Sequence, residues 1–289
     1  MSTTTTTKPI ETPSGKNADY ENFPVGSWLL PARLRPHIAV FYRFARAIDD
    51  IADNPDLSAE TKIDRLTGFE CALNGSNTDD ASYQTGHHMR ASLLQTDVPL
   101  QHCLDLITAF KQDATQNRYD NWDDLIQYCL LSAAPVGRYL VDLHGGSVDG
   151  YGPSDALSNA LQVINHLQDC QDDYRTLDRV YLPGDWMAEA SVKVEDLDAT
   201  HCSPGLRAVL DQCLDATADV MEQARDLPSG VNSRRLAMES QAIINIADRL
   251  IVRLRHADPL SAPVKLSKPG YLWCSLSGAL TALLLGKKR

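Results

Sequence analysis

The sequence has no uninterrupted apolar run of the roughly 18 to 20 residues that a bilayer-spanning helix needs. It is also short of basic charge, with 27 Lys and Arg against 38 Asp and Glu and a formal net charge of −11. A surface that follows nucleic-acid phosphates over the whole molecule is therefore not expected. The first residues lack the apolar segment of a secretory signal. These absences exclude a membrane-spanning protein and make nucleic acid a poor partner.

Cysteine pairs and dinucleotide fingerprints are missing as well. The seven cysteines are odd in number and form no C-x-x-C pair, and most lie within apolar helical patterns. Thiols in such positions behave as small core side chains, which is typical of the reducing cytoplasm. No G-x-G-x-x-G follows a strand, so a dinucleotide domain is not evident. We therefore expect a cytoplasmic protein with no nucleotide-binding domain of its own.

Apolar residues recur with the period of an α-helix, and convincing alternating runs are absent. This predicts an all-α, single-domain protein in residues 20–289, preceded by a disordered threonine-rich tail in residues 1–19. Pro135 lies inside the helical pattern of residues 120–144 and predicts a kink there. A second long helix is expected over residues 153–174, and a loop over residues 226–230. The other predicted helices are 36–54, 58–73, 86–96, 100–116, 204–226, 231–256 and 266–285.

The first candidate for chemistry is the segment FYRFARAIDDIADN, which begins at Phe41. Asp49 and Asp53 are four residues apart, so on a helix both carboxylates lie on one face and can share a cation. Arg46 and Tyr42 extend the same polar stripe towards the amino terminus. Taken alone, this spacing also suits a solvated helix face in so acidic a chain.

The second candidate repeats this spacing at Asp169 and Asp173, with Gln162 and Asn165 on the same face. Apolar residues border that face, as they do when a polar row lines a cavity. Ionised carboxylates in a cavity need compensating cations. Oxygen ligands favour Mg²⁺ or Mn²⁺, and the lack of a His/Cys ligand set argues against zinc. His166 is expected to be a packed imidazole rather than a ligand.

Two such acidic helices facing each other across an apolar cavity can ionise an allylic diphosphate. Metal ions neutralise the departing diphosphate, while apolar walls and aromatic faces tolerate a carbocation and restrict water. Basic side chains complete the binding of the diphosphate. Arg43, Arg46 and Arg179 are among the basic residues nearest to the acidic segments in sequence.

These motifs resemble those of the head-to-head prenyl synthases, the family of squalene, dehydrosqualene and phytoene synthases. The family's Y-x-F-x-R-x-x-D-D-x-x-D is met at residues 42–53, and its Q-x-x-N-x-x-x-D-x-x-x-D at residues 162–173, followed by RVYLP. Asp113, Arg118, Tyr119 and the SAAPVGR segment also resemble the family's middle region. The likeness spans residues 21–258 and implies an isoprenoid-synthase helical bundle around a central cavity.

The resemblance implies roles for ten residues. The implied metal ligands are Asp49, Asp53, Asn165, Asp169 and Asp173, which hold Mg²⁺. The four aspartates, Tyr42 and Gln162 are the implied catalytic residues, and Arg46, Asn165, Tyr128 and Arg179 the implied substrate-binding residues. For Tyr128, a packed core tyrosine with one satisfied hydroxyl is an equal alternative.

Within the family, the chain is most similar to the bacterial hydroxysqualene synthases of hopanoid synthesis. This similarity implies ionisation and rearrangement of presqualene diphosphate, followed by addition of water, with no NADPH and with other pathway enzymes as partners. The alternatives are a squalene, presqualene diphosphate or dehydrosqualene synthase that condenses two farnesyl diphosphates, and a non-catalytic lipid-binding helical scaffold. Asn22 stands where phytoene and dehydrosqualene synthases usually carry serine, and residues 240–250 lack their tyrosine.

The end of the chain is apolar over residues 271–285 and basic at Lys287, Lys288 and Arg289. Two interpretations fit this pattern. One is a last helix docked on the core; the other is a helix on an anionic membrane surface with its basic tail among the headgroups. The second interpretation predicts a peripheral location on the cytoplasmic face of the membrane.

Overall fold

The computed structural model describes residues 10–11 and 30–285. Over these residues the chain folds as a helical bundle without a strand, and the extended segments contribute only a bridge between Arg118 and Val180. The prediction of an all-α protein is confirmed. The predicted tail lies outside the described residues except for Ile10 and Glu11. The carbonyl of Ile10 accepts a hydrogen bond of 3.0 Å from the Arg65 guanidinium.

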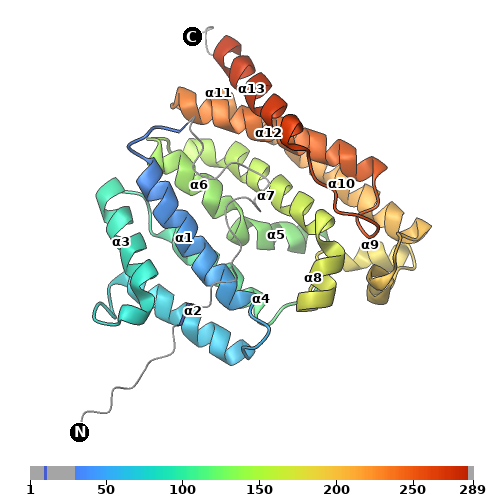
Figure 1. Ribbon diagram of the computed structural model, residues 1–289, viewed down its shortest axis with the longest axis horizontal. Helices are drawn as coiled ribbons and strands as arrows, with labels where there is room; N and C mark the ends of the chain where they lie inside the picture. The colour runs from blue at the N-terminus through green and yellow to red at the C-terminus, as the bar shows by residue number, and fades with distance from the viewer. Residues whose placement is uncertain (1–9, 12–29, 286–289) are drawn as a thin grey trace.

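Figure 1 shows how the helices of the bundle are arranged. In chain order they are α1 (Arg35–Ala52), α2 (Ala59–Asn74), α3 (Gln84–Thr96), α4 (Gln101–Asp113), α5 (Trp122–Ser132), α6 (Ala134–Leu143), α7 (Tyr151–Gln168), α8 (Cys170–Leu177), α9 (Gly184–Glu189), α10 (Pro204–Ala224), α11 (Leu227–Gly230), α12 (Arg234–His256) and α13 (Lys268–Leu285). Helix α1 packs on α2, α3 and α4, whereas α7 packs on α5, α6, α10 and α12. Phe41 of α1 stacks on Tyr139 of α6, with ring centroids 3.9 Å apart, and thereby links these two groups of helices.

Two helices predicted as continuous are broken in the structure. The first ends at Ser132 and resumes at Ala134, and Pro135 lies in the first turn of α6. A proline is tolerated there because the first N–H groups of a helix have no intrahelical partner. The second breaks at Asp169, whose φ of −106° and ψ of 11° depart from helical values. Residues 226–230, predicted as a loop, include the short helix α11.

Candidate active site

The first acidic motif lies at the carboxyl end of α1. Phe44, Ile48 and Ile51 are fully buried. At 3.6 residues per turn, this anchoring leaves Asp49 and Asp53 together on another, half-buried side of the helix. Asp53 ends the helix, and its N–H donates to the Asp49 carbonyl over 2.9 Å. The local sequence therefore places both carboxylates at the rim of the bundle, one turn apart.

Arg46 and Asp49 form an ion pair within this motif. Even so, the pKa of Asp49 is raised from its ordinary 3.8 to about 7, chiefly by burial and also by the negative charge of Asp53, against the opposing effect of Arg46. A carboxylate whose ionisation is opposed by burial and by a neighbouring carboxylate is stabilised in its charged form by a bound cation. Tyr42 is half-buried, whereas Arg43 is exposed.

Arg179 connects the two acidic motifs. Its side chain is 5% exposed. It donates to a carboxylate oxygen of Asp53 over 2.6 Å and to the carbonyls of Ala52 and Asp113 over 3.0 and 3.3 Å. Its own N–H donates to the Asp173 carbonyl over 3.2 Å. One buried guanidinium therefore joins the ends of α1 and α4 to the end of α8.

The turn that directs Arg179 inward is built from Asp178. This residue ends α8 in the left-handed region, with a φ of 51°, a conformation that Asp tolerates better than most side chains. Its carboxylate accepts a hydrogen bond of 2.6 Å from Arg118. Two residues further on, the N–H of Val180 donates to the Asn117 carbonyl over 2.9 Å. The segment after α8 is thus held against the segment after α4.

Asp113 is a buried carboxyl group for which the sequence predicted no role. One of its oxygens accepts a hydrogen bond of 3.0 Å from the Tyr128 hydroxyl, and the other has no partner among the described residues. Burial raises the pKa of Asp113 from 3.8 to about 7, and the charges of Asp53 and Asp173 act in the same direction. Asp113 therefore lies close enough to Asp53 and Asp173 to interact electrostatically with both carboxylates. An acidic residue after the apolar pattern of α4 was the signal that could have identified it.

Aromatic side chains form the wall beside these carboxylates. The imidazole of His166 stacks on Tyr181 with centroids 3.5 Å apart, and Tyr181 also stacks on Tyr119 and Tyr128 at 5.6 Å. Burial lowers the pKa of His166, so its neutral form is favoured. His166 is therefore a packed imidazole, as expected. Tyr128 is buried, and its hydroxyl donates a hydrogen bond to Asp113. This is the geometry expected of a packed core tyrosine with one satisfied hydroxyl.

The second acidic motif surrounds the break between α7 and α8. The N–H of Asp169 donates to the Asn165 carbonyl over 2.9 Å, and that of Asp173 to the Asp169 carbonyl over 2.8 Å. Gln162, Asn165 and Asp173 are half-buried, whereas Asp169 is exposed. A carboxylate oxygen of Asp173 lies 3.9 Å from Nδ1 of His166. The break therefore gives the two aspartates of this motif different surroundings.

The predicted ligands fit a divalent cation in their chemistry. Carboxylate and amide oxygens are suited to Mg²⁺ or Mn²⁺, and the pKa of Asp49 is raised by burial and, to a smaller extent, by the negative charge of Asp53. Over residues 10–11 and 30–285, no three His, Cys, Asp or Glu side chains are already grouped closely enough to hold a metal ion. Arg46 and Arg179 pair with Asp49 and Asp53 of the first acidic motif. The metal-ligand roles therefore stay predictions.

Comparison with known proteins places this geometry in context. The model of the squalene/phytoene synthase family matches residues 17–269. A hydroxysqualene synthase of Rhodopseudomonas palustris is 42% identical over 276 residues, which cover 96% of this chain and 93% of the relative. A hydroxysqualene synthase of Sinorhizobium fredii is 41% identical over 248 residues, which cover 86% of this chain and 84% of the relative. The crystal structure of a squalene synthase of Alicyclobacillus acidocaldarius is similar with a TM-score of 0.72 and 28% identity, over 80% of this chain and 87% of that one.

Proposed function

The chain belongs to the squalene/phytoene synthase family, and from that premise we propose that it is a hydroxysqualene synthase. In this reaction presqualene diphosphate loses its diphosphate, the carbocation rearranges, and water adds to give hydroxysqualene. The observation that carries the choice within the family is the identity of 41 to 42% with hydroxysqualene synthases over most of both chains. Phytoene synthases are 27 to 30% identical over 65 to 83% of this chain.

The proposed metal ligands are Asp49, Asp53, Asn165, Asp169 and Asp173. Bound Mg²⁺, or Mn²⁺ in its place, would neutralise the charge of the departing diphosphate. Support for this proposal comes from the oxygen-only donor set and from the mutual repulsion of Asp49 and Asp53. No reductant is needed, because the carbocation is quenched by water, and we therefore propose that NADPH is not used.

The two arginines of the site have different proposed tasks. Arg46 pairs with Asp49 of the first acidic motif, and its side chain is 19% exposed, so part of it can be reached by a diphosphate. Arg179 is buried and donates to three protein oxygens. We therefore propose that Arg46 binds the diphosphate, and that Arg179, predicted as a substrate-binding residue, instead holds Asp53 in position.

The proposed wall for the hydrocarbon part of the substrate is aromatic and neutral. The pKa values of Tyr128 and Tyr181 are raised well above 10 by burial, so both remain uncharged phenols. Aromatic faces stabilise a nearby cation through the negative charge of the ring face. Tyr42 and Gln162 lie on the half-buried faces of α1 and α7 and are the proposed contacts near the reacting carbons.

One assay separates this function from its alternatives. The purified chain is incubated with Mg²⁺ and either presqualene diphosphate or farnesyl diphosphate, without NADPH, and the products are identified. Hydroxysqualene from presqualene diphosphate is the expected result. Presqualene diphosphate or dehydrosqualene from farnesyl diphosphate, with no alcohol from the other substrate, would identify a condensing synthase. A chain that binds either compound without turnover would be a lipid-binding scaffold.

The location of the reaction is also a proposal. Among the helices of the described residues, none is both long and apolar enough to cross a membrane. The proposed substrate and product nevertheless carry long hydrocarbon chains that are poorly soluble in water. We propose that the enzyme works on the cytoplasmic face of the membrane, where it receives the substrate from the enzyme of the preceding step and releases the alcohol to the next.

A further inference from the structure

Helix α13 lies almost entirely outside the part of the chain that matches the family model, which ends at residue 269. It crosses the outer side of α12 at the edge of the bundle (Figure 1). Gly278 approaches α12 so closely that an added Cβ would lie 2.5 Å from the Cα and N atoms of Ala242. The side-chain amide of Asn245 is hydrogen-bonded to the Ser277 hydroxyl at 3.2 Å. One side of α13 is thus firmly packed.

The opposite side of α13 is apolar and faces solvent. We call this side the docking face; it consists of Leu272, Trp273, Leu276, Leu280, Leu283 and Leu284, whose exposed fractions range from 38 to 63%. At 3.6 residues per turn, these six positions fall within about 120° of the helix circumference. Contiguous exposed apolar surface of this kind marks an interaction site. Trp also suits a membrane interface because its ring is apolar and its N–H is polar.

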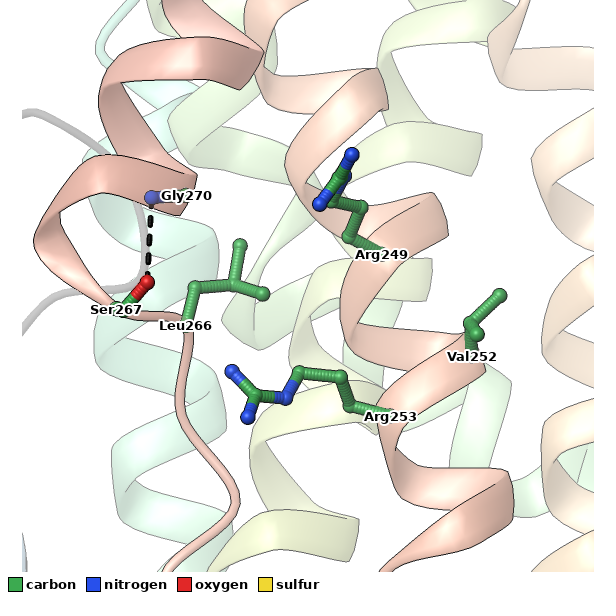
Figure 2. A pocket seen from close by; sticks show the side chains of 6 residues that line it. All are labelled: Arg249, Val252, Arg253, Leu266, Ser267 and Gly270. Atoms are coloured by element: carbon green, nitrogen blue, oxygen red, sulfur yellow. Dashed lines mark hydrogen bonds between the residues drawn. The ribbon is translucent and has the colours of Figure 1, made fainter.

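Basic side chains lie beside the amino end of the docking face. Arg249, Val252 and Arg253 of α12 line a pocket of about 410 Å³ together with Leu266, Ser267 and Gly270. Figure 2 shows both guanidinium groups directed towards the segment that leads into α13. Arg253 donates to the Lys265 carbonyl over 2.7 Å. The pocket extends to Gly270. It therefore places positive charge next to Leu272, the first residue of the docking face.

These cations differ from the other arginines nearby. Arg225 pairs with Asp248 and Arg255 with Asp215. In contrast, the described part of the chain offers no carboxylate within ion-pair distance of Arg249, Arg253, Lys265 or Lys268, and all four are exposed. Basic side chains without an internal carboxylate are available to an external anion.

The sequence separates charge in the same way. Residues 249–289 contain eight Lys and Arg and one acidic residue, Asp258, whereas the preceding 248 residues contain 19 basic and 37 acidic residues. One end of a strongly acidic chain is therefore positive. A second copy docked through this face would bring two positive surfaces together, which is unfavourable. A surface of lipid phosphates would complement both the charge and the apolar stripe.

We infer that the docking face of α13, flanked by Arg249 and Arg253, binds an anionic lipid bilayer surface while the opposite side of the helix stays packed on α12. The inference rests on the proposed function in one respect, since a membrane-borne hydrocarbon substrate gives such binding a purpose. It specifies the surface that holds the enzyme at the membrane. The apolar side chains enter the boundary between headgroups and acyl chains, and the arginines bind lipid phosphates.

The test measures co-sedimentation of the full chain with vesicles of phosphatidylcholine alone or mixed in equal parts with phosphatidylglycerol. Wild-type protein should prefer the mixed vesicles. The combined L276E and L280E substitutions should weaken this binding roughly tenfold or more, because two exposed leucines that would enter the bilayer are lost. The matched control is L94E with V148E, which places the same change at exposed leucine and valine positions elsewhere and should leave binding within about twofold.

A second pair of variants tests the charges. Combined R249Q and R253Q should reduce binding to the mixed vesicles roughly fivefold or more and weaken its dependence on salt. Combined R225Q and R255Q removes two paired cations and should leave vesicle binding unchanged. Quenching of tryptophan emission by brominated acyl chains should occur in the wild-type chain and fall in W273F.

The inference is overturned if wild-type protein binds both vesicle types equally, or if L276E with L280E binds as well as wild type. It is also overturned if light scattering shows a dimer that these two substitutions convert to a monomer. Turnover of presqualene diphosphate in detergent micelles should be the same in all these variants. Vesicle binding without turnover would reject the proposed function alone, and turnover without vesicle binding would reject this inference alone.

Discussion

Arg179 donates a hydrogen bond of 2.6 Å to Asp53, which lies 126 residues earlier in the chain. The pair joins the end of the first acidic motif to the segment that follows the second. A buried arginine with three protein acceptors acts as a fixed internal cation. Its position explains how an acidic site keeps its shape before any substrate is bound, because the charge of Asp53 is already compensated.

Replacement of Arg179 by alanine should therefore destabilise the fold. The change leaves the charge of Asp53 and the carbonyls of Ala52 and Asp113 without their donor, and loss of one partner of a buried ion pair costs about 3 to 5 kcal/mol. The lower half of that range is expected, since the Asp53 side chain is 29% exposed. Urea denaturation measures the loss. Arg118→Ala, at the exposed pair with Asp178, is the control and should cost less than about 1 kcal/mol.

Tyr128→Phe should show how much the hydrogen bond from the Tyr128 hydroxyl to Asp113 contributes to stability. Removal of the hydroxyl leaves a second buried oxygen of Asp113 without a hydrogen-bond donor, which costs about 1 to 3 kcal/mol. The pKa of Asp113, already raised by burial to about 7, should rise further, because the Tyr128 hydrogen bond lowers it. The free energy of unfolding measured against pH checks both effects. An unchanged stability at pH 8 would contradict the contact.

Asp49→Asn should stabilise the metal-free protein at alkaline pH. The folded protein raises the pKa of Asp49 from 3.8 to about 7, so ionisation of this group costs stability as the pH rises through that interval. Asparagine carries no charge and avoids the cost, which we place on the order of 1 to 2 kcal/mol after allowance for solvent screening and the lost Arg46 pair.

Thermal melts in EDTA at pH 8 and pH 5 provide the measurement. The melting temperature of D49N should exceed that of wild type at pH 8, and the difference should shrink at pH 5, where Asp49 is mostly protonated in the folded, metal-free protein. Asp172→Asn, an exposed aspartate of α8, is the control. A D49N protein that is less stable at pH 8 would show that the Arg46 pair outweighs the repulsion from Asp53.

The helical period was sufficient to predict an all-α fold and most of the helices, since it reports directly on which side of each helix is buried. The break at Asp169 could not be predicted, because no glycine or proline marks it and only the tertiary packing of α7 and α8 produces it. Asp113 was missed for a related reason. Its environment comes from Asp53, Asp173 and Arg179, which are distant in sequence. The spacing of residues along one helix identifies a polar face, but it does not identify which residues of another helix contact that face.

Gly278→Ala should loosen the last helix. The new Cβ would lie 2.5 Å from backbone atoms of Ala242, which cannot move aside as a flexible side chain can. Overpacking of this kind costs about 1 to 3 kcal/mol. Faster proteolytic cleavage within α13 and a lower melting temperature are expected. Gly152→Ala is the matched control, since a Cβ there meets no atom within 4 Å. Equal cleavage of both variants would contradict the close packing of α13 on α12.

Asp169→Asn should abolish most of the turnover of presqualene diphosphate without affecting folding. Asp169 is exposed at the junction of α7 and α8, so its replacement disturbs no core packing. If it binds Mg²⁺, loss of one ligand charge should lower kcat/KM by roughly 100-fold and shift the Mg²⁺ titration to higher concentration. The melting temperature in EDTA should match that of wild type. Asp172→Asn changes an exposed carboxylate three residues away and should retain full activity. Turnover of D169N within about twofold of wild type would remove Asp169 from the metal site.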